Sequence, residues 1–128
     1  MAKGRITPNG VVLETHENAT VVFMTEQGFD VELIPPSQLK GERTPDIRMN
    51  GLEWEMKAPI GKSANTIKRA FKSAIRQSSN IIFDLRNSQL SDEVNIGKLD
   101  KEFSDIKKVR RLLIITKAHG LIEKYKQK

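Results

Sequence analysis

The sequence contains no cysteine, which excludes disulfide bonds, thiolate metal sites and cysteine nucleophiles. It also has no apolar run close to the ~18 residues that a membrane-spanning helix needs. The first residues lead into no hydrophobic signal core. We therefore expect a chain without a signal peptide or membrane span, whose site of action is the cytoplasm.

Acidic residues are missing from residues 57–83, a stretch that holds six of the 22 Lys and Arg. The rest of the chain carries 16 basic and 16 acidic residues, so this stretch accounts for the formal net charge of +6. Its cations are Lys57, Lys62, Lys68, Arg69, Lys72 and Arg76. Such a concentration of positive charge suggests a polyanionic partner, most simply nucleic acid, although Lys and Arg on a helix surface also serve solubility alone.

The length of 128 residues is sufficient for one domain with a hydrophobic core and too short for two. Hydrophobic residues make up 38% of the chain and charged residues 30%, which is typical of a globular protein. We predict a single domain over residues 1–128, with its core at about 12–126.

Residues 45–58 are predicted to form a tight β-hairpin around Asn50-Gly51, because both central positions of a two-residue turn need a positive φ. This turn places Met49 opposite Leu52, and side chains then alternate between the two faces. The apolar face carries Ile47, Met49, Leu52, Trp54 and Met56. The charged face carries Asp46, Arg48, Glu53, Glu55 and Lys57.

The predicted register places Asp46 opposite Glu55, and like charges in this arrangement are destabilising. A cation between the two carboxylates would relieve the repulsion, and oxygen ligands suit Mg²⁺ or Mn²⁺. A charged hairpin face is more often simply solvated, and a Pro-Asp followed after a gap by Glu-x-Lys is common by chance. The metal hypothesis therefore depends on the opposition of Asp46 and Glu55 and on the surrounding elements.

Apolar periodicity predicts three helices and six strands, which indicates an α/β fold. The helices are expected at 12–27, 64–78 and 96–109, with a polar connection over Ser88–Asn95. The strands are expected at 29–34, 45–49, 52–58, 80–85, 112–116 and 121–125. Ser63 is the expected N-cap of the second helix, whose buried stripe is Ile67, Phe71, Ala74 and Ile75. The strand at 80–85 follows a single crossover helix, so we expect it to lie parallel to the second hairpin strand.

The order α-β-β-β-α-β, with Pro45-Asp46 on the second strand and Glu55-Met56-Lys57 on the third, resembles the PD-(D/E)XK nuclease superfamily. This resemblance implies a restriction-endonuclease-like core, here with an added C-terminal helix and β-hairpin. The wider sequence resembles the C-terminal toxin domain of CdiA proteins, whose members act as tRNA nucleases in contact-dependent growth inhibition. The segments that carry this likeness include His16-Glu17, residues 28–35, residues 80–86 and residues 111–117.

The superfamily resemblance implies a role for each residue of the motif. Asp46 and Glu55 match its metal-binding carboxylates, and the backbone carbonyl of Met56 matches a further ligand. Lys57 matches the lysine that positions or activates water or stabilises charge on the phosphate. The implied cofactor is Mg²⁺, with Mn²⁺ or Zn²⁺ as alternatives.

A glutamate on the first helix often completes such a site, and Glu17 matches it best, with Glu14 as a weaker candidate. Glu17 shares a helix face with Leu13, Val21 and Met24, where a carboxylate without a partner is unexpected. The alternative is a residue at the edge of the helix that reaches water.

The predicted substrate-binding residues follow the hairpin. Lys62 precedes a helix N-terminus, where phosphates bind readily. Arg69, Lys72 and Arg76 are expected to hold a polyanion near the site. Gln77 resembles a glutamine that several of these nucleases carry there, although a surface glutamine is the plainer interpretation.

These features predict a metal-dependent endonuclease that hydrolyses phosphodiester bonds. The CdiA likeness favours RNA, specifically tRNA, and implies a toxin with an immunity protein as partner. One alternative is a DNA endonuclease of the same fold from a mobile element, because the metal chemistry acts on either polymer. The other is a non-catalytic nucleic-acid-binding domain, against which the intact Asp46, Glu55 and Lys57 argue.

Overall fold

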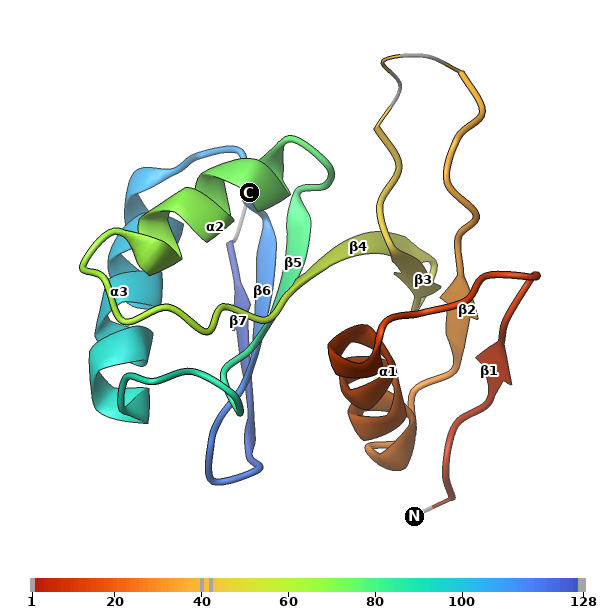
Figure 1. Ribbon diagram of the computed structural model, residues 1–128, viewed down its shortest axis with the longest axis horizontal. Coiled ribbons are helices and arrows are strands. Elements are labelled where there is room, and N and C mark those ends of the chain that lie inside the picture. Colours follow the sequence, from red (N-terminus) through yellow and green to blue (C-terminus); the bar gives the residue numbers. More distant parts are fainter. Residues whose placement is uncertain (1, 40, 42, 127–128) are drawn as a thin grey trace.

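The computed structural model describes residues 2–39, 41 and 43–126. Its elements in order are β1 (Ile6–Thr7), α1 (Thr15–Glu26), β2 (Val31–Leu33), β3 (Ile47–Met49), β4 (Leu52–Lys57), α2 (Thr66–Ile75), β5 (Asn80–Asp84), α3 (Asp92–Asp105), β6 (Arg111–Ile115) and β7 (Leu121–Tyr125). The strands form a mixed seven-stranded sheet in the order β1 to β7 (Figure 1). No helix in these ranges combines the length and apolar character that crossing a membrane requires.

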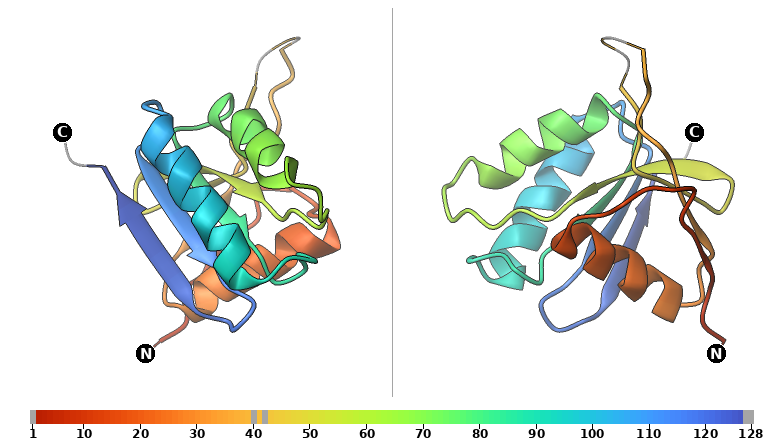
Figure 2. Two further views of the ribbon diagram at one scale, coloured as in Figure 1. Left: turned by 90° about the vertical axis from the view of Figure 1, so that its left-hand side faces the viewer. Right: turned by 45° about the vertical axis from the view of Figure 1, so that its right-hand side comes forward.

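Two hydrophobic cores lie on opposite faces of the sheet. Figure 2 shows α2 and α3 side by side over one face and α1 on the other. The core beneath α1 includes Val21, Met24, Ile47, Met49, Trp54 and Met56. The core beneath α2 and α3 includes Ile67, Phe71, Ala74, Ile81, Phe83 and Leu99. The buried stripe predicted for the second helix is confirmed, and Ile75 packs against it partly buried.

The six predicted strands are present, and their ends differ from the expected ends by no more than two residues. β5 pairs in parallel with both β4 and β6. Its side chains from Asn80 to Asp84 are all buried, as expected for a central strand covered on both faces. The prediction that the strand at 80–85 lies parallel to the second hairpin strand is therefore confirmed.

The hairpin is also confirmed, with the predicted register for three pairs of residues. Met49 pairs with Leu52, and the next two pairs along the strands follow as expected. The fourth predicted pair, Asp46 with Glu55, does not form, because strand pairing ends at Ile47 and the N–H of Asp46 donates to the carbonyl of Trp54. Asn50 and Gly51 have φ values of 55° and 73°, the positive values that a two-residue hairpin turn requires.

Strand β4 changes its partner halfway along its length. Residues 52–54 pair antiparallel with β3, and residues 55–57 pair in parallel with β5. In Figure 1, β4 crosses from the hairpin to the strands beneath α2. The sheet therefore has a branch point between Trp54 and Glu55, in the middle of the motif that the sequence analysis singled out.

The predicted boundaries of the third helix are wrong. The helix begins inside the stretch 88–95 that was expected to be a polar connection, and it ends before the limit of the expected range 96–109. The hydroxyl of Ser91 accepts a hydrogen bond from the N–H of Val94 at 3.2 Å and caps the helix. At the other end, Ile106 has extended backbone. Some of the polar residues that suggested a loop, from Ser91 to Asn95, thus form the N-cap and the first turn of α3.

The first two helices are shorter than the predicted ranges 12–27 and 64–78. The first begins after Glu14, whose backbone is extended. The second begins after Asn65, so Ser63 is not its N-cap. The hydroxyl of Ser63 instead accepts a hydrogen bond from the N–H of Asn65 at 3.2 Å, in the turn that leads into the helix.

Strand β1 lies before the predicted core of residues 12–126. It consists of two exposed residues that pair in parallel with β2, Ile6 with Val31 and Thr7 with Glu32. A strand of this length has no periodicity that a sequence pattern could reveal.

A buried ion pair that the sequence analysis did not anticipate joins α1 to the end of β5. The Arg86 Nη2 atom lies 2.7 Å from Asp84 Oδ2, and its guanidinium also donates to the carbonyl of Ala19 on α1. Thr20 Oγ1 donates to the same Asp84 oxygen at 2.8 Å. Burial alone would raise the pKa of Asp84, but the hydrogen bonds from Arg86 and Thr20 outweigh it and hold that pKa below its usual range.

Removing the carboxylate with Asp84→Ala should lower the free energy of unfolding at pH 7 by about 2–4 kcal/mol, because Arg86 keeps a partly buried charge without a partner. The double variant Asp84→Leu/Arg86→Met should lose less. Since the pKa of Asp84 is lowered by folding, its contribution should disappear as the pH falls through that pKa.

Urea unfolding of each variant measures this effect, with Glu32→Ala as the control because Glu32 forms an exposed ion pair with Arg48. Equal losses for Asp84→Ala and Glu32→Ala would contradict the structural role of the Asp84–Arg86 pair.

Candidate active site

The candidate site lies where β4 leaves β3 and joins β5. Side chains alternate along β4, so Trp54 and Met56 enter the core beneath α1 while Glu55 and Lys57 lie on the side of α2. The change of partner strand leaves one edge of β4 without a strand neighbour beyond Trp54. Asp46 occupies that edge.

Asp46 is held by three hydrogen bonds to its neighbours. Its N–H donates to the carbonyl of Trp54 at 3.0 Å, and its carbonyl accepts from the N–H of Ile34 at 3.0 Å. Its carboxylate oxygen Oδ2 accepts from the N–H of Met56 at 2.8 Å. Strand pairing therefore ends at Ile47, and the side chain of Asp46 replaces a backbone carbonyl as the partner of β4.

The backbone of Met56 faces the same edge. The N–H and C=O groups of one strand residue point to the same side of the strand. Because the N–H of Met56 reaches Asp46, its carbonyl also points toward the side on which Asp46 lies. The sequence resemblance implies three metal ligands. Two of them, the carboxylate of Asp46 and the carbonyl of Met56, thus lie at the same edge of β4.

Lys57 connects the carboxylates to α2. Its Nζ atom lies 3.7 Å from Oε2 of Glu55 and donates to Oγ of Ser73 at 3.3 Å. Ser73 was not among the predicted site residues. Only the approach of α2 to β4 reveals it, because its position on the helix has no signal in the sequence.

Glu55 is in an unfavourable environment for a charged carboxylate. Burial and the negative charge of Asp46 raise its pKa from 4.5 to about 8, despite the opposing charge of Lys57. Its Oε1 atom is buried and has no hydrogen-bond partner among the described residues. Burial also raises the pKa of Asp46, against the effect of the Met56 N–H. The two carboxylates therefore need a proton or a cation.

Glu17 lies near this pair, and its negative charge contributes to the raised pKa of Asp46. However, its Oε1 atom accepts a hydrogen bond from the N–H of Glu14 at 3.1 Å and so caps α1. This cap explains why a carboxylate stands next to apolar neighbours on the helix. In residues 2–39, 41 and 43–126, no group of three or more His, Asp or Glu side chains is arranged to hold a metal ion.

The donors that are present nevertheless fit a hard divalent cation. Mg²⁺ is commonly bound through one or two carboxylates, with waters and substrate phosphates completing its shell. Asp46, Glu55 and the carbonyl of Met56 supply such a set. The unpartnered Oε1 of Glu55 is the observation that favours a cation here.

The predicted substrate-binding residues do not all face the site. Ser73 marks the side of α2 that meets Lys57. Residues three or four positions away share that side of a helix, which places Arg69 and the C-cap residue Arg76 with Ser73. Lys72 is its immediate neighbour and therefore points elsewhere. Gln77 lies beyond the end of α2, in the turn that leads to β5.

Lys62 and Lys68 also lie apart from that side of α2. Lys62 is exposed in the loop before α2. Lys68 turns toward α3, where it lines a separate hollow with Lys98 and Lys101.

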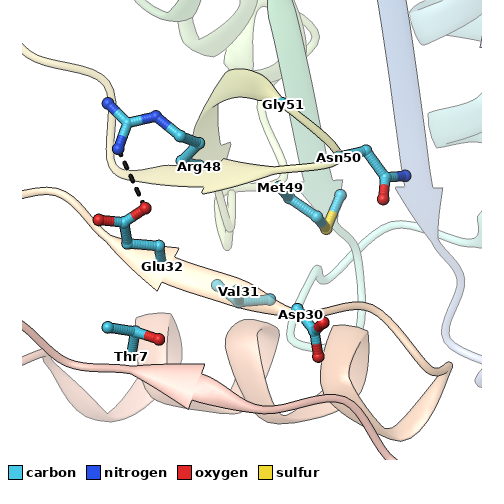
Figure 3. Close-up of a pocket in the computed structure, with 8 residues that line it drawn as sticks. All are labelled: Thr7, Asp30, Val31, Glu32, Arg48, Met49, Asn50 and Gly51. Atoms are coloured by element: carbon cyan, nitrogen blue, oxygen red, sulfur yellow. Dashed lines mark hydrogen bonds and ion pairs between the residues drawn. The ribbon is translucent and has the colours of Figure 1, made fainter.

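A hollow on the outer strands is separate from the carboxylates. It has a volume of about 270 Å³ and is lined by residues of β1, β2, β3 and the hairpin turn (Figure 3). Within it, Arg48 donates to Glu32 at 3.1 Å and also to Glu53 at 3.1 Å. Its lining carries two carboxylates, Asp30 and Glu32, and one cation, Arg48, and it includes none of the predicted catalytic residues.

The family model of the contact-dependent growth inhibition CdiA C-terminal domain matches residues 43–121. The chain therefore belongs to this family, as the sequence resemblance predicted. The matched range contains Asp46, Glu55, Lys57 and the whole of α2, whereas Glu17 lies outside it.

The fold resembles that of a chain in a CdiA-CT/CdiI toxin and immunity complex from Burkholderia pseudomallei. The two chains share 18% sequence identity with a TM-score of 0.70, over 96% of this chain and 100% of the other. At this identity the similarity shows a shared fold. No curated protein sequence matches the chain.

The variant Glu55→Gln should stabilise the metal-free protein at pH 8. A carboxyl whose pKa is raised by folding binds more protons in the folded state, so stability falls as the pH rises from about 4.5 to about 8. Removing the charge should raise the free energy of unfolding by roughly 2–4 kcal/mol at pH 8 and much less at pH 4.5.

Urea unfolding in EDTA at both pH values tests this expectation, with Glu53→Gln as the control because Glu53 is exposed on the same strand. A loss of stability in Glu55→Gln at pH 8 would show that the carboxylate is structural.

Proposed function

We propose that the chain is a metal-dependent nuclease of the PD-(D/E)XK type that cleaves RNA, specifically tRNA, as a growth-inhibition toxin. The observation that carries this proposal is the gathering of Asp46, Glu55 and Lys57 at the branch point of β4, with a buried and unpartnered oxygen on Glu55. The order α-β-β-β-α-β from α1 to β5 supports the superfamily assignment.

Asp46, Glu55 and the carbonyl of Met56 would hold the cation, with Mg²⁺ preferred and Mn²⁺ or Zn²⁺ as alternatives. A bound divalent ion supplies a Lewis acid for a phosphate oxygen and lowers the pKa of a bound water. Lys57 would position the attacking water or stabilise negative charge on the phosphate, and Ser73 fixes its ammonium group. Glu17 would support the site from α1 by its charge.

Arg69 and Arg76 are the cations that share the Lys57 side of α2, so they would hold the phosphates of the polymer near the carboxylates. Gln77, in the turn after α2, would bind substrate next to Arg76, whereas Lys62 and Lys72 would contribute to the general attraction of a polyanion. RNA is favoured over DNA by the family resemblance alone. The similar chain from Burkholderia pseudomallei occurs in a complex with an immunity protein, which supports such a partner for this chain.

Asp46→Ala and Glu55→Ala should each abolish cleavage while the fold is retained, because each removes one of the two carboxylates. The assay incubates the purified chain with tRNA, rRNA, plasmid and single-stranded DNA, with Mg²⁺ or with EDTA. Cleavage of tRNA that needs Mg²⁺ is expected. Glu53→Ala is the control and should remain active.

Cleavage of plasmid but not of RNA would instead indicate the DNA endonuclease alternative. Binding without cleavage of any polymer would indicate a non-catalytic nucleic-acid-binding domain.

The double variant Arg69→Ala/Arg76→Ala should weaken RNA binding and make it less dependent on salt. Each lost phosphate contact should reduce the slope of log K against log salt by about 0.7–0.9. The matched control Lys68→Ala/Lys72→Ala removes the same charge from other sides of α2 and should leave the slope nearer to that of the wild type.

Fluorescence anisotropy with labelled tRNA in EDTA, over a range of KCl concentrations, measures both slopes. Equal slopes for the two double variants would show that net charge matters here and not the side of the helix.

A further inference from the structure

A hollow between α2 and α3 gathers positive charge from both helices. It has a volume of about 210 Å³ and lies at the start of α2, where the two helices run side by side (Figure 2). Lys68 comes from the first turn of α2, and Lys98 and Lys101 come from one side of α3. Three ammonium groups around one small space repel one another, so an anion between them is favourable.

The backbone at the start of α2 adds to this positive potential. The first N–H groups of a helix have no partner within it, and the helix dipole is positive at that end. Asn65 is the N-cap of α2 and lines the hollow, but its side chain forms no capping hydrogen bond. Lys98 Nζ donates to the carbonyl of Ala64 at 3.3 Å and so connects α3 to the residue before this cap. Three cations beside an uncapped helix N-terminus suit a phosphate group.

A buried carboxylate in the hollow has no partner. Glu102 is only 8% exposed and lies one turn after Lys98 on α3, among the residues that line the hollow. No ion pair or side-chain hydrogen bond among the described residues involves its carboxylate, although three lysines line the same space. Because buried polar groups are normally paired, this carboxylate suits a ligand that donates a hydrogen bond.

A phosphate group that keeps one proton satisfies the lysines and the carboxylate together. Its charged oxygens accept hydrogen bonds from ammonium groups, and its P–O–H group donates to a carboxylate. A phosphate monoester loses this last proton only at about pH 6. Sulfate has no proton near neutral pH, and the internal phosphates of RNA are diesters that also have none. The charge of Glu102 would repel both of these anions.

We infer that the hollow between α2 and α3 binds inorganic phosphate or a terminal phosphate monoester, and that Glu102 accepts the phosphate proton. Lys68, Lys98 and Lys101 hold the charged oxygens. The site is separate from the side of α2 that meets Lys57, and it selects against the internal phosphates of RNA. The inference therefore goes beyond the proposed nuclease function and does not depend on it.

The choice between phosphate and sulfate tests the role of Glu102. Isothermal titration calorimetry of the full chain in EDTA at pH 6 should show that phosphate binds about tenfold more tightly than sulfate, about the difference that one hydrogen bond provides. Glu102→Gln replaces the carboxylate with an amide that also donates, so the preference should disappear. The matched control Glu93→Gln, exposed on the first turn of α3, should keep the preference.

The lysines are tested by a second pair of variants. Lys68→Ala/Lys101→Ala should weaken phosphate binding by about tenfold or more, because two of the three cations are lost. Lys107→Ala/Lys108→Ala removes the same charge from exposed positions after α3 and should bind phosphate like the wild type. Arg69→Ala/Arg76→Ala should also bind phosphate like the wild type, which separates this site from the candidate active site.

Equal affinity of the wild type for phosphate and sulfate, or no phosphate binding, would overturn the inference. A preference that survives in folded Glu102→Gln would do the same. If that variant does not fold, unchanged phosphate binding by Lys68→Ala/Lys101→Ala is the contradicting result. Competition by ribose 5-phosphate would identify monoesters as ligands, and its absence would leave free phosphate. Phosphate binding without cleavage of any polymer would refute the nuclease proposal and leave this site standing.

Discussion

The division of strand β4 between two partners is the constraint on which the rest of the structure depends. Its first half pairs with β3 and its second half with β5. This division joins the hairpin to the strands beneath α2 and leaves one edge of the second half open. Asp46 fills that edge through its bond to the Met56 N–H, and the branch brings it to Glu55 and Lys57.

Two buried carboxylates in this chain illustrate how neighbouring groups decide whether the pKa of a buried carboxyl is lowered or raised. Asp84 receives hydrogen bonds from Arg86 and Thr20, and its pKa is lowered in spite of burial. Glu55 faces another carboxylate, retains an unpartnered oxygen, and has a pKa raised to about 8. The first arrangement stabilises the fold by joining α1 to β5. The second costs stability, and a bound cation would relieve that cost.

Helix α2 serves different purposes on its different sides. Its buried stripe packs on the sheet, with Phe71 stacked on Phe83 at 5.7 Å between ring centroids. The side that carries Ser73 meets Lys57, and Arg69 and Arg76 share it. Lys68 turns toward α3. The basic side chains of this stretch therefore lie on different sides of α2, and only some of them share the side that meets Lys57.

The sequence by itself determined the hairpin, the buried stripe of α2 and the parallel placement of β5, because a turn dipeptide, helical periodicity and a single crossover act over short distances. The same hairpin pattern predicted that Asp46, Glu55 and Lys57 belong to one site. The tertiary structure decided the rest: the change of partner within β4, the Asp84–Arg86 bond to α1 and the support of Lys57 by Ser73. Each depends on segments that meet only after folding, and the residues involved have ordinary polar neighbours in the sequence. The physical reason is that periodicity shows which face of an element is buried, whereas the partner of a polar group is set by the packing of one element on another.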